Sequence, residues 1–178
     1  FTPAGFLNIH LKDSYLCGIL GRAGADSVAA QPNAKGPMMI EFVSANPTGP
    51  LHIGHGRGAA LGDSLARIFR VRGRKVQTEY YVNDRGFQME MLANSVRARF
   101  AELRGEGGEF PKNGYQGDYI RDIAKVMLDG KRDDFSVYPR TVIQDGISKD
   151  LELFGVGFDN WYSETGLYPD KVNAVLKT

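Results

Sequence analysis

Two histidines three residues apart, His52 and His55, lie in a glycine-rich stretch that is equipped to bind phosphate. An imidazole N–H donates hydrogen bonds to phosphate oxygens, and Gly54 lets a flat ring or a phosphate approach the backbone where a Cβ would collide. The stretch precedes a helical pattern, and a helix N-terminus offers unpaired N–H groups and a partial positive charge. Fixed donors of this kind stabilise negative charge as it develops during transfer at phosphorus.

The histidine pair has two other interpretations. His-x-x-His is a common zinc fragment, but a closed zinc site needs about four ligands, and the other candidates, His10 and Cys17, lie beyond a stretch rich in Gly, Ala and Pro. We therefore expect no metal bound by protein side chains. The pair could also serve only to cap the helix, and the residues alone leave that alternative open.

A strand, a helix and a second strand must position these histidines. The bulky apolar run 38–44 predicts a largely buried strand, and the turn-rich stretch 45–58 follows it. Residues 76–82 alternate between apolar and polar side chains, which predicts the second strand. Such a unit normally forms a parallel pair whose ligands bind at the carboxyl ends of the strands. The sequence therefore predicts an α/β fold.

The helix between the strands is expected to begin at about Ala59 and to end at Gly73, a typical C-terminal cap. The spacing predicts that one apolar face is formed by Leu61, Leu65, Ile68 and Phe69.

Farther along, further helices are predicted over about 89–103, 120–127, 143–154 and from 172, with an exposed loop at 102–113. Residues 158–169 are aromatic and irregular, and 17–37 have the composition of a linker or mobile loop. We expect three parts: the end of a preceding domain plus a linker (1–37), the first half of a catalytic domain (38–157), and the start of a further catalytic or inserted segment (158–178).

Composition argues against several classes of protein. The chain has 178 residues, of which 42% are hydrophobic, and its formal net charge is +1, so it can build a core and shows no strong basic excess. No apolar run approaches the roughly 20 residues that cross a bilayer. One cysteine, Cys17, and no secretory signal favour a reducing, cytoplasmic setting, with Cys17 as a small buried hydrophobe.

The run Ser44-Ala-Asn-Pro-Thr-Gly-Pro-Leu-His-Ile-Gly-His55 resembles the signature of class I aminoacyl-tRNA synthetases, and within them the bacterial arginyl-tRNA synthetases. Further matches are Glu41-Phe-Val-Ser, Gly62-Asp63, Tyr80-Tyr-Val-Asn-Asp-Arg-Gly-Phe-Gln88, Gly114-Tyr-x-Gly-Asp-Tyr-Ile-Arg121 and Phe158-Asp-x-Trp-Tyr-Ser-Glu164. The resemblance covers about residues 38–170, and the block from Glu41 to His55 is highly specific. It implies the first half of a Rossmann-like parallel sheet with additional helices.

The resemblance also implies a reaction. ATP and L-arginine would form an arginyl-adenylate, and the arginyl group would pass to tRNA(Arg), with Mg²⁺ accompanying ATP. His52 and His55 would be the catalytic residues, and ATP would contact His52, Gly54, His55 and Gly56. The residues implied for arginine binding are Glu41, Ser44, Asn46, Asp84 and Gln88. The full-length protein is expected to be a monomer without membrane contact.

Several of these residues have structural alternatives. Glu41 could be a salt-bridged strand residue, and Asn46 a turn former before Pro47. The group 83–86 could be a turn and N-cap for the next helix. The basic cluster 67–75 suits a solvated helix end better than tRNA contact, and Tyr115, Tyr119 and Trp161 suit a core or interface better than base stacking.

The chain also lacks segments that the family needs. The lysine-bearing loop that grips pyrophosphate, the remaining guanidinium contacts and the anticodon-binding domain have no counterpart in it. We therefore expect an incomplete part of the enzyme, which does not charge tRNA by itself. The alternatives are a non-catalytic synthetase paralogue or binding module, and another nucleotidyltransferase with the same tetrad.

Overall fold

The computed structural model describes residues 10–22 and 36–177; the predicted end of a preceding domain lies largely outside these residues. The elements run in the order α1 (Asp13–Arg22), β1 (Met38–Glu41), α2 (Ile53–Val71), β2 (Val76–Val82), α3 (Phe87–Leu103), α4 (Asp118–Asp129), α5 (Tyr138–Leu153), β3 (Asn160–Ser163), the short 3-10 helix η1 (Glu164–Leu167) and α6 (Asp170–Leu176).

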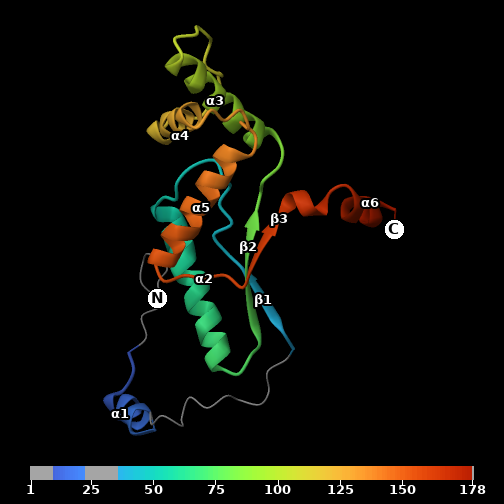
Figure 1. Cartoon of the computed structure of the whole chain (residues 1–178). Helices are drawn as coiled ribbons and strands as arrows, with labels where there is room; N and C mark the ends of the chain where they lie inside the picture. Colours follow the sequence, from blue (N-terminus) through green and yellow to red (C-terminus); the bar gives the residue numbers. More distant parts are fainter. Residues whose placement is uncertain (1–9, 23–35, 178) are drawn as a thin grey trace, which may run out of the picture.

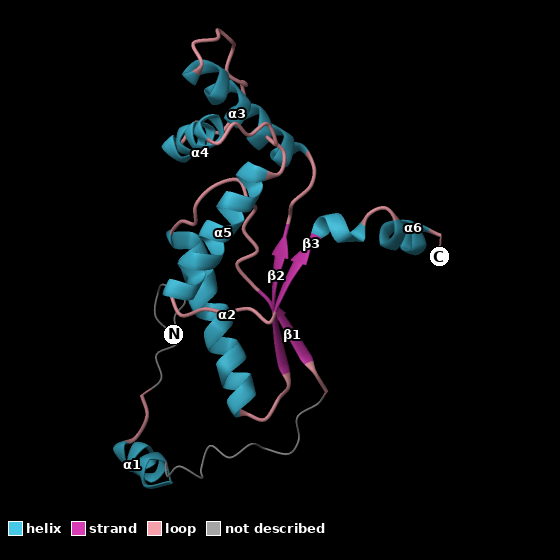
Figure 2. Cartoon of the chain, viewed as in Figure 1, coloured by secondary structure: helices cyan, strands magenta, loops and turns pink. Residues whose placement is uncertain are grey.

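The three strands form one open sheet in the order β1-β2-β3, and both neighbouring pairs are parallel. This confirms the predicted α/β fold with a parallel strand–helix–strand unit. Helices α2 and α5 lie on the same side of the sheet, while α3 and α4 lie beyond the carboxyl ends of the strands (Figures 1 and 2). The expectation of an irregular segment at 158–169 is wrong, because β3 pairs with β2 there; a four-residue strand shows too little alternation to be recognised.

The core lies between the sheet and the helices on its covered side and continues between α3, α4 and α5 beyond the strand ends. Tyr80 at its centre is fully buried, and its ring stacks on Trp161 at a centroid distance of 4.2 Å. The other large buried side chains come from α3, α4 and α5: Leu92, Val96, Ile120, Met127, Ile147 and Leu151. The helices predicted over about 120–127 and 143–154 are confirmed as α4 and α5, except that α5 ends at Leu153.

Strand β1 is shorter and more exposed than expected. It ends at Glu41, because Val43 and Ser44 both have positive φ angles, 65° and 42°. The Tyr81 backbone N–H of β2 donates a hydrogen bond to the Ser44 hydroxyl. A side chain, and not a backbone carbonyl of β1, is therefore the acceptor at this point of the sheet edge. As an edge strand, β1 has half-exposed or exposed residues throughout, and the prediction of a largely buried strand is wrong.

Helix α2 differs from the prediction in its start and in its buried face. It begins at Ile53, so the two histidines belong to its N-terminus and the turn-rich stretch ends at His52. Its buried positions are Ala59, Gly62 and Ala66. The expected apolar face is largely open, since Leu61 is 61% and Ile68 57% exposed.

Gly73 follows the end of α2 with a φ of 78°, as expected of a C-terminal glycine. The Arg74 N–H donates to the Phe69 carbonyl and the Gly73 N–H to that of Arg70, the pattern that closes helices at glycine.

Helix α1 includes Cys17, where a linker was expected. Cys17 is exposed, so the prediction of a buried cysteine is also wrong; its neighbours on the helix are exposed as well, and α1 offers it no core. Among the described residues, no helix is both long and apolar enough to span a membrane.

Candidate functional site

The N-terminus of α2 is capped by the two histidines themselves. His52 is the N-cap residue, and its Nδ1 accepts a hydrogen bond from the Gly54 N–H at 3.1 Å. His55 completes a reciprocal arrangement, since its Nδ1 accepts from the His52 N–H at 3.2 Å. A capping box of this form satisfies two backbone donors that a helix start otherwise leaves unpaired.

The caps fix which ring nitrogen can donate to a ligand. Because Nδ1 of each ring accepts a hydrogen bond, each ring in its neutral form carries its proton on Nε2. The rings stack at a centroid distance of 3.7 Å and an angle of 17°. Burial lowers the pKa of His55, and the nearby His52 lowers it further. The site therefore favours a neutral His55 with an Nε2–H donor.

A cavity of about 430 Å³ adjoins this helix end. It brings together four of the residues predicted for the site: Asn46, His52, His55 and Gln88. Asn46 donates a hydrogen bond from Nδ2 to Oε1 of Gln88, so the end of α3 nearest the sheet is joined to the loop after β1. Asn46 also begins a tight turn, because the Asn46 carbonyl accepts a hydrogen bond from the Thr48 N–H. The turn alternative predicted this arrangement.

Sequence reasoning missed the other side chains of this cavity. Thr48, Pro50, Tyr115 and Tyr119 line it beside the predicted residues. The two tyrosines belong to the Gly114-Tyr-x-Gly-Asp-Tyr match, which was the available signal, but their aromatic character suggested a core role.

Glu41 and Ser44 form a second pair, joined to each other. The Ser44 hydroxyl donates to Oε1 of Glu41, and the same hydroxyl oxygen accepts from the Tyr81 N–H. Within the described part of the chain Glu41 forms no ion pair, so the salt-bridged alternative is not supported. Its exposed carboxylate remains open to a cationic ligand.

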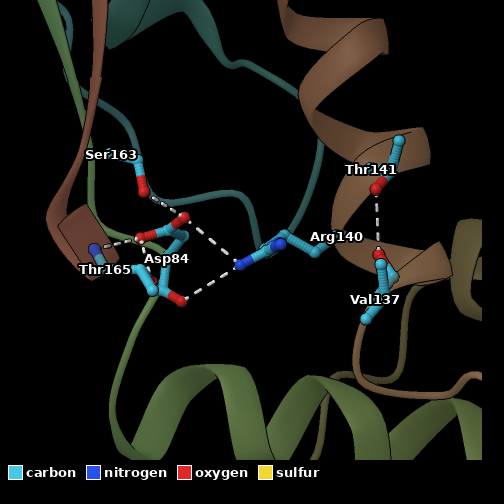
Figure 3. Close-up of polar contacts among 6 residues, drawn as sticks. All are labelled: Asp84, Val137, Arg140, Thr141, Ser163 and Thr165. Carbon is cyan, nitrogen blue, oxygen red and sulfur yellow. Dashed lines mark hydrogen bonds and ion pairs between the residues drawn. The ribbon is translucent and has the colours of Figure 1, made fainter.

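Asp84 lies elsewhere, in a network of protein donors (Figure 3). Its Oδ1 accepts from the Thr165 N–H and hydroxyl at 2.9 and 2.8 Å, and its Oδ2 from the Ser163 hydroxyl at 2.7 Å. Arg140 adds an ion pair to Oδ2 at 3.2 Å. Asp84 thus joins the end of β2 to the β3–η1 junction and to α5, beside a separate cavity of about 370 Å³.

The environment of Asp84 favours its charged form. Burial alone would raise the pKa of this carboxyl, but the hydrogen bonds from Ser163 and Thr165 and the charge of Arg140 together lower it. Gly86, the last residue of the group 83–86, is the N-cap of α3, so the N-cap alternative holds for this group; the cap has no side-chain hydrogen bond, and the Asp84 carboxylate does not take part in it.

Gly54 is adapted to the histidine cap. A Cβ on residue 54 would lie 3.0 Å from the His52 ring. The absence of a Cβ at Gly54 therefore leaves the room that the capping position of the His52 ring needs. Gly56 has open space around its Cα. No cluster of three or more metal-ligating side chains occurs in the ranges 10–22 and 36–177.

An open parallel sheet with a helix N-terminus directly after its first strand is the arrangement of nucleotide-binding α/β domains. The family model described as tRNA synthetases class I (R), catalytic domain, matches residues 19–111. The chain belongs to this family, the arginyl-tRNA synthetases.

Relatives agree with this assignment. The chain is 44% identical to the arginine–tRNA ligase of Syntrophotalea carbinolica over 92% of its own length, and 44% identical to that of Geobacter sp. strain M21 over 97%. It spans 32% and 34% of those two proteins. A Campylobacter jejuni crystal structure described as an arginyl-tRNA synthetase matches with a TM-score of 0.75 and 34% identity, covering 94% of this chain and 40% of that one.

Proposed function

We propose that this chain is part of an enzyme that attaches L-arginine to tRNA(Arg) through an arginyl-adenylate formed from ATP. The observation that carries the proposal is the cavity at the start of α2, where two Nε2–H donors lie beside Asn46 and Gln88. Family membership supplies the substrate class. Because the chain spans about a third of its relatives, the whole reaction belongs to a longer protein.

In this reaction the arginine carboxylate attacks the α-phosphorus of ATP, and pyrophosphate leaves. The Nε2–H groups of His52 and His55 would donate to phosphate oxygens as negative charge moves toward the leaving group. The positive dipole end of α2 adds to this stabilisation. No side chain of this chain needs to act as a nucleophile.

The arginine would be bound by groups from the loop after β1 and from α3. Asn46 and Gln88 would hold its α-amino and carboxylate end, and Glu41, oriented by Ser44, would accept hydrogen bonds from the guanidinium. Asp84, which the family resemblance also implies, already accepts from four protein donors. We therefore propose that it contributes through the position of the β2 end.

ATP would lie against Gly54 and Gly56, where no Cβ obstructs the backbone. Mg²⁺ would arrive with the ATP phosphates, which normally carry it, and no step here depends on it. We further propose a cytoplasmic protein that is monomeric at full length, with the chain divided at about residues 37 and 157.

The test is a charging assay on the protein encoded by the complete reading frame, with bulk tRNA, ATP, Mg²⁺ and each amino acid supplied separately. Attachment of arginine alone supports the proposal. A protein that binds ATP but charges nothing would instead be a non-catalytic paralogue. Charging by the isolated 178-residue chain would contradict our expectation that this part is incomplete.

A further inference from the structure

The loop that joins β1 to α2 is held by two tyrosine hydroxyls from elements distant in sequence. Tyr80 of β2 donates to the Ala45 carbonyl at 2.9 Å, and Tyr119 of α4 donates to the Thr48 carbonyl at 2.7 Å. The two carbonyls flank Asn46 and Pro47, and Pro47 itself is fully buried. The backbone on both sides of Asn46 is thus fixed by side chains from outside the loop.

Both hydroxyls are fully used as donors to the loop. Burial raises the pKa of Tyr80 to about 12, although its bond to Ala45 opposes the shift, and burial raises the pKa of Tyr119 as well. Each hydroxyl therefore keeps its proton at neutral pH. Since each proton is directed at a carbonyl, neither hydroxyl is free to donate to a substrate.

The ring of Tyr119 is seated closely against two glycines. A Cβ on Gly49 would lie 3.0 Å from its hydroxyl oxygen, and a Cβ on Gly117 would lie 2.5 Å from its ring. This seat places the ring on the wall of the cavity that Asn46, His52 and His55 also line. The backbone at Gly49 and Gly117 thus restricts the position of the Tyr119 ring, and with it the position of the hydroxyl that donates to Thr48.

We propose that Tyr80 and Tyr119 are positioning residues, which hold the loop 45–52 so that Asn46 and His52 meet their ligands in a fixed geometry. The inference rests on the proposed function for the identity of those ligands. It predicts that removing one hydroxyl alters the binding of arginine although that hydroxyl donates to the loop and not to the arginine. Preorganised groups lose effect when the backbone that carries them moves.

The test uses Tyr119→Phe in the complete protein, because this change removes one oxygen and keeps the ring between its glycines. Tyr80→Phe is the second variant, and its fully buried site makes it the more destabilising of the two. The control is Tyr138→Phe, since Tyr138 is half-buried at the start of α5 and does not line the cavity.

Two measurements decide the outcome. Amide hydrogen exchange without substrate should be faster across residues 45–56 in Tyr119→Phe and unchanged there in Tyr138→Phe. The KM for arginine should rise about three- to tenfold, the range expected for one net hydrogen bond. A hydroxyl that only stabilised the fold would lower the unfolding midpoint and leave the KM of the folded protein unchanged.

Unchanged exchange in the loop would overturn the proposal, and so would faster exchange with an unchanged KM. If the parent protein charges no arginine at all, the proposed function fails. The exchange measurement still decides whether the two hydroxyls hold the loop, because it needs neither arginine nor tRNA.

Discussion

The imidazoles of His52 and His55 have an inner and an outer edge with different partners. The inner Nδ1 atoms accept backbone N–H groups at the start of α2, and the outer Nε2 atoms remain for a ligand. From the sequence, helix capping and phosphate binding appeared as alternatives. The geometry makes them compatible, because the cap selects the tautomer that donates outward.

Amide substitutions can separate the two edges of His55. In His55→Asn the side-chain oxygen can replace Nδ1 in the cap, whereas in His55→Gln the amide nitrogen can replace Nε2. We expect His55→Asn to keep stability within about 0.5 kcal/mol but to lower the activation rate by more than about tenfold. His55→Gln should retain more activity and lose about 1 kcal/mol of stability. Thermal unfolding and arginine activation on the complete protein would check both, and equal behaviour would refute the division of roles.

The histidine cap also predicts a pH dependence. Protonation of His55 at Nδ1 removes the acceptor that holds the His52 N–H. Because the folded-state pKa of His55 is below its ordinary value of 6.5, the unfolded chain takes up this proton first. Stability is therefore complete above 6.5 and falls as the pH drops through the folded-state value. The loss in melting temperature between about pH 7.5 and about pH 5.5 should be smaller in His55→Asn; an identical loss would exclude this group as its cause.

Asp84 should behave as a structural junction. In Asp84→Asn the carboxylate is lost and two donors face an amide N–H₂, so we expect about 2 kcal/mol of destabilisation. Since the pKa of Asp84 is lowered, the wild-type contribution is complete above 3.8 and disappears as the pH falls through the lower folded-state value. The control is Asp145→Asn on α5, where the carboxylate is exposed and the change should stay within about 0.5 kcal/mol. Urea unfolding of the two variants measures both effects. Equal unfolding midpoints for Asp84→Asn and Asp145→Asn would refute the structural role of Asp84.

At the scale of elements, α2 shows what hydrophobic spacing reveals and what it conceals. The large side chains Leu61, Leu65 and Ile68 correctly indicated a helix, but they do not face the sheet. The face that does is made of Ala59, Gly62 and Ala66. Small residues let the helix approach the strands closely, and a pattern search weighted toward large apolar groups overlooks such a face.

Two glycines on α2 provide a matched test of this close approach. A methyl group at Gly62 would overlap the Phe42 ring, whereas the same group at Gly58 meets nothing within 4 Å. Gly62→Ala should therefore destabilise the fold by about 1–3 kcal/mol through overpacking. Gly58→Ala should stabilise it by about 0.5–1 kcal/mol through helix propensity. Opposite shifts of the melting temperature are the expected result, and shifts of the same sign would contradict the packing of α2 against Phe42, the residue after β1.

The candidate site divides in the same way between what was predictable and what was not. The tetrad at the start of α2 could be found because its chemistry lies within four consecutive residues. The hydrogen bond from Asn46 to Gln88 joins residues 42 positions apart, and that from Tyr119 to Thr48 spans 71. Such pairs depend on how α3 and α4 pack over the strand ends. The local spacing of residue types does not determine that packing.

For the molecule as a whole, the open face of α2 is the feature that the chain does not explain by itself. Leu61, Leu65 and Ile68 lie at i, i+4 and i+7, and all three are exposed. Contiguous apolar surface of this kind usually marks an interaction site. Because the chain spans 32% of its Syntrophotalea relative, we expect the rest of the complete protein to cover this face.

Replacing Leu61 and Leu65 together by Gln tests that expectation. In the isolated chain the double variant should change the free energy of unfolding by no more than about 1 kcal/mol, because both side chains are already exposed. In the complete protein it should cost about 2 kcal/mol or more, since apolar area buried there would be lost. Ile147→Ala is the control: Ile147 is only 1% exposed, so its loss should cost about 2–5 kcal/mol in both. If the double variant lowered the free energy of unfolding equally in the isolated chain and in the complete protein, this face of α2 would be exposed in the complete protein as well.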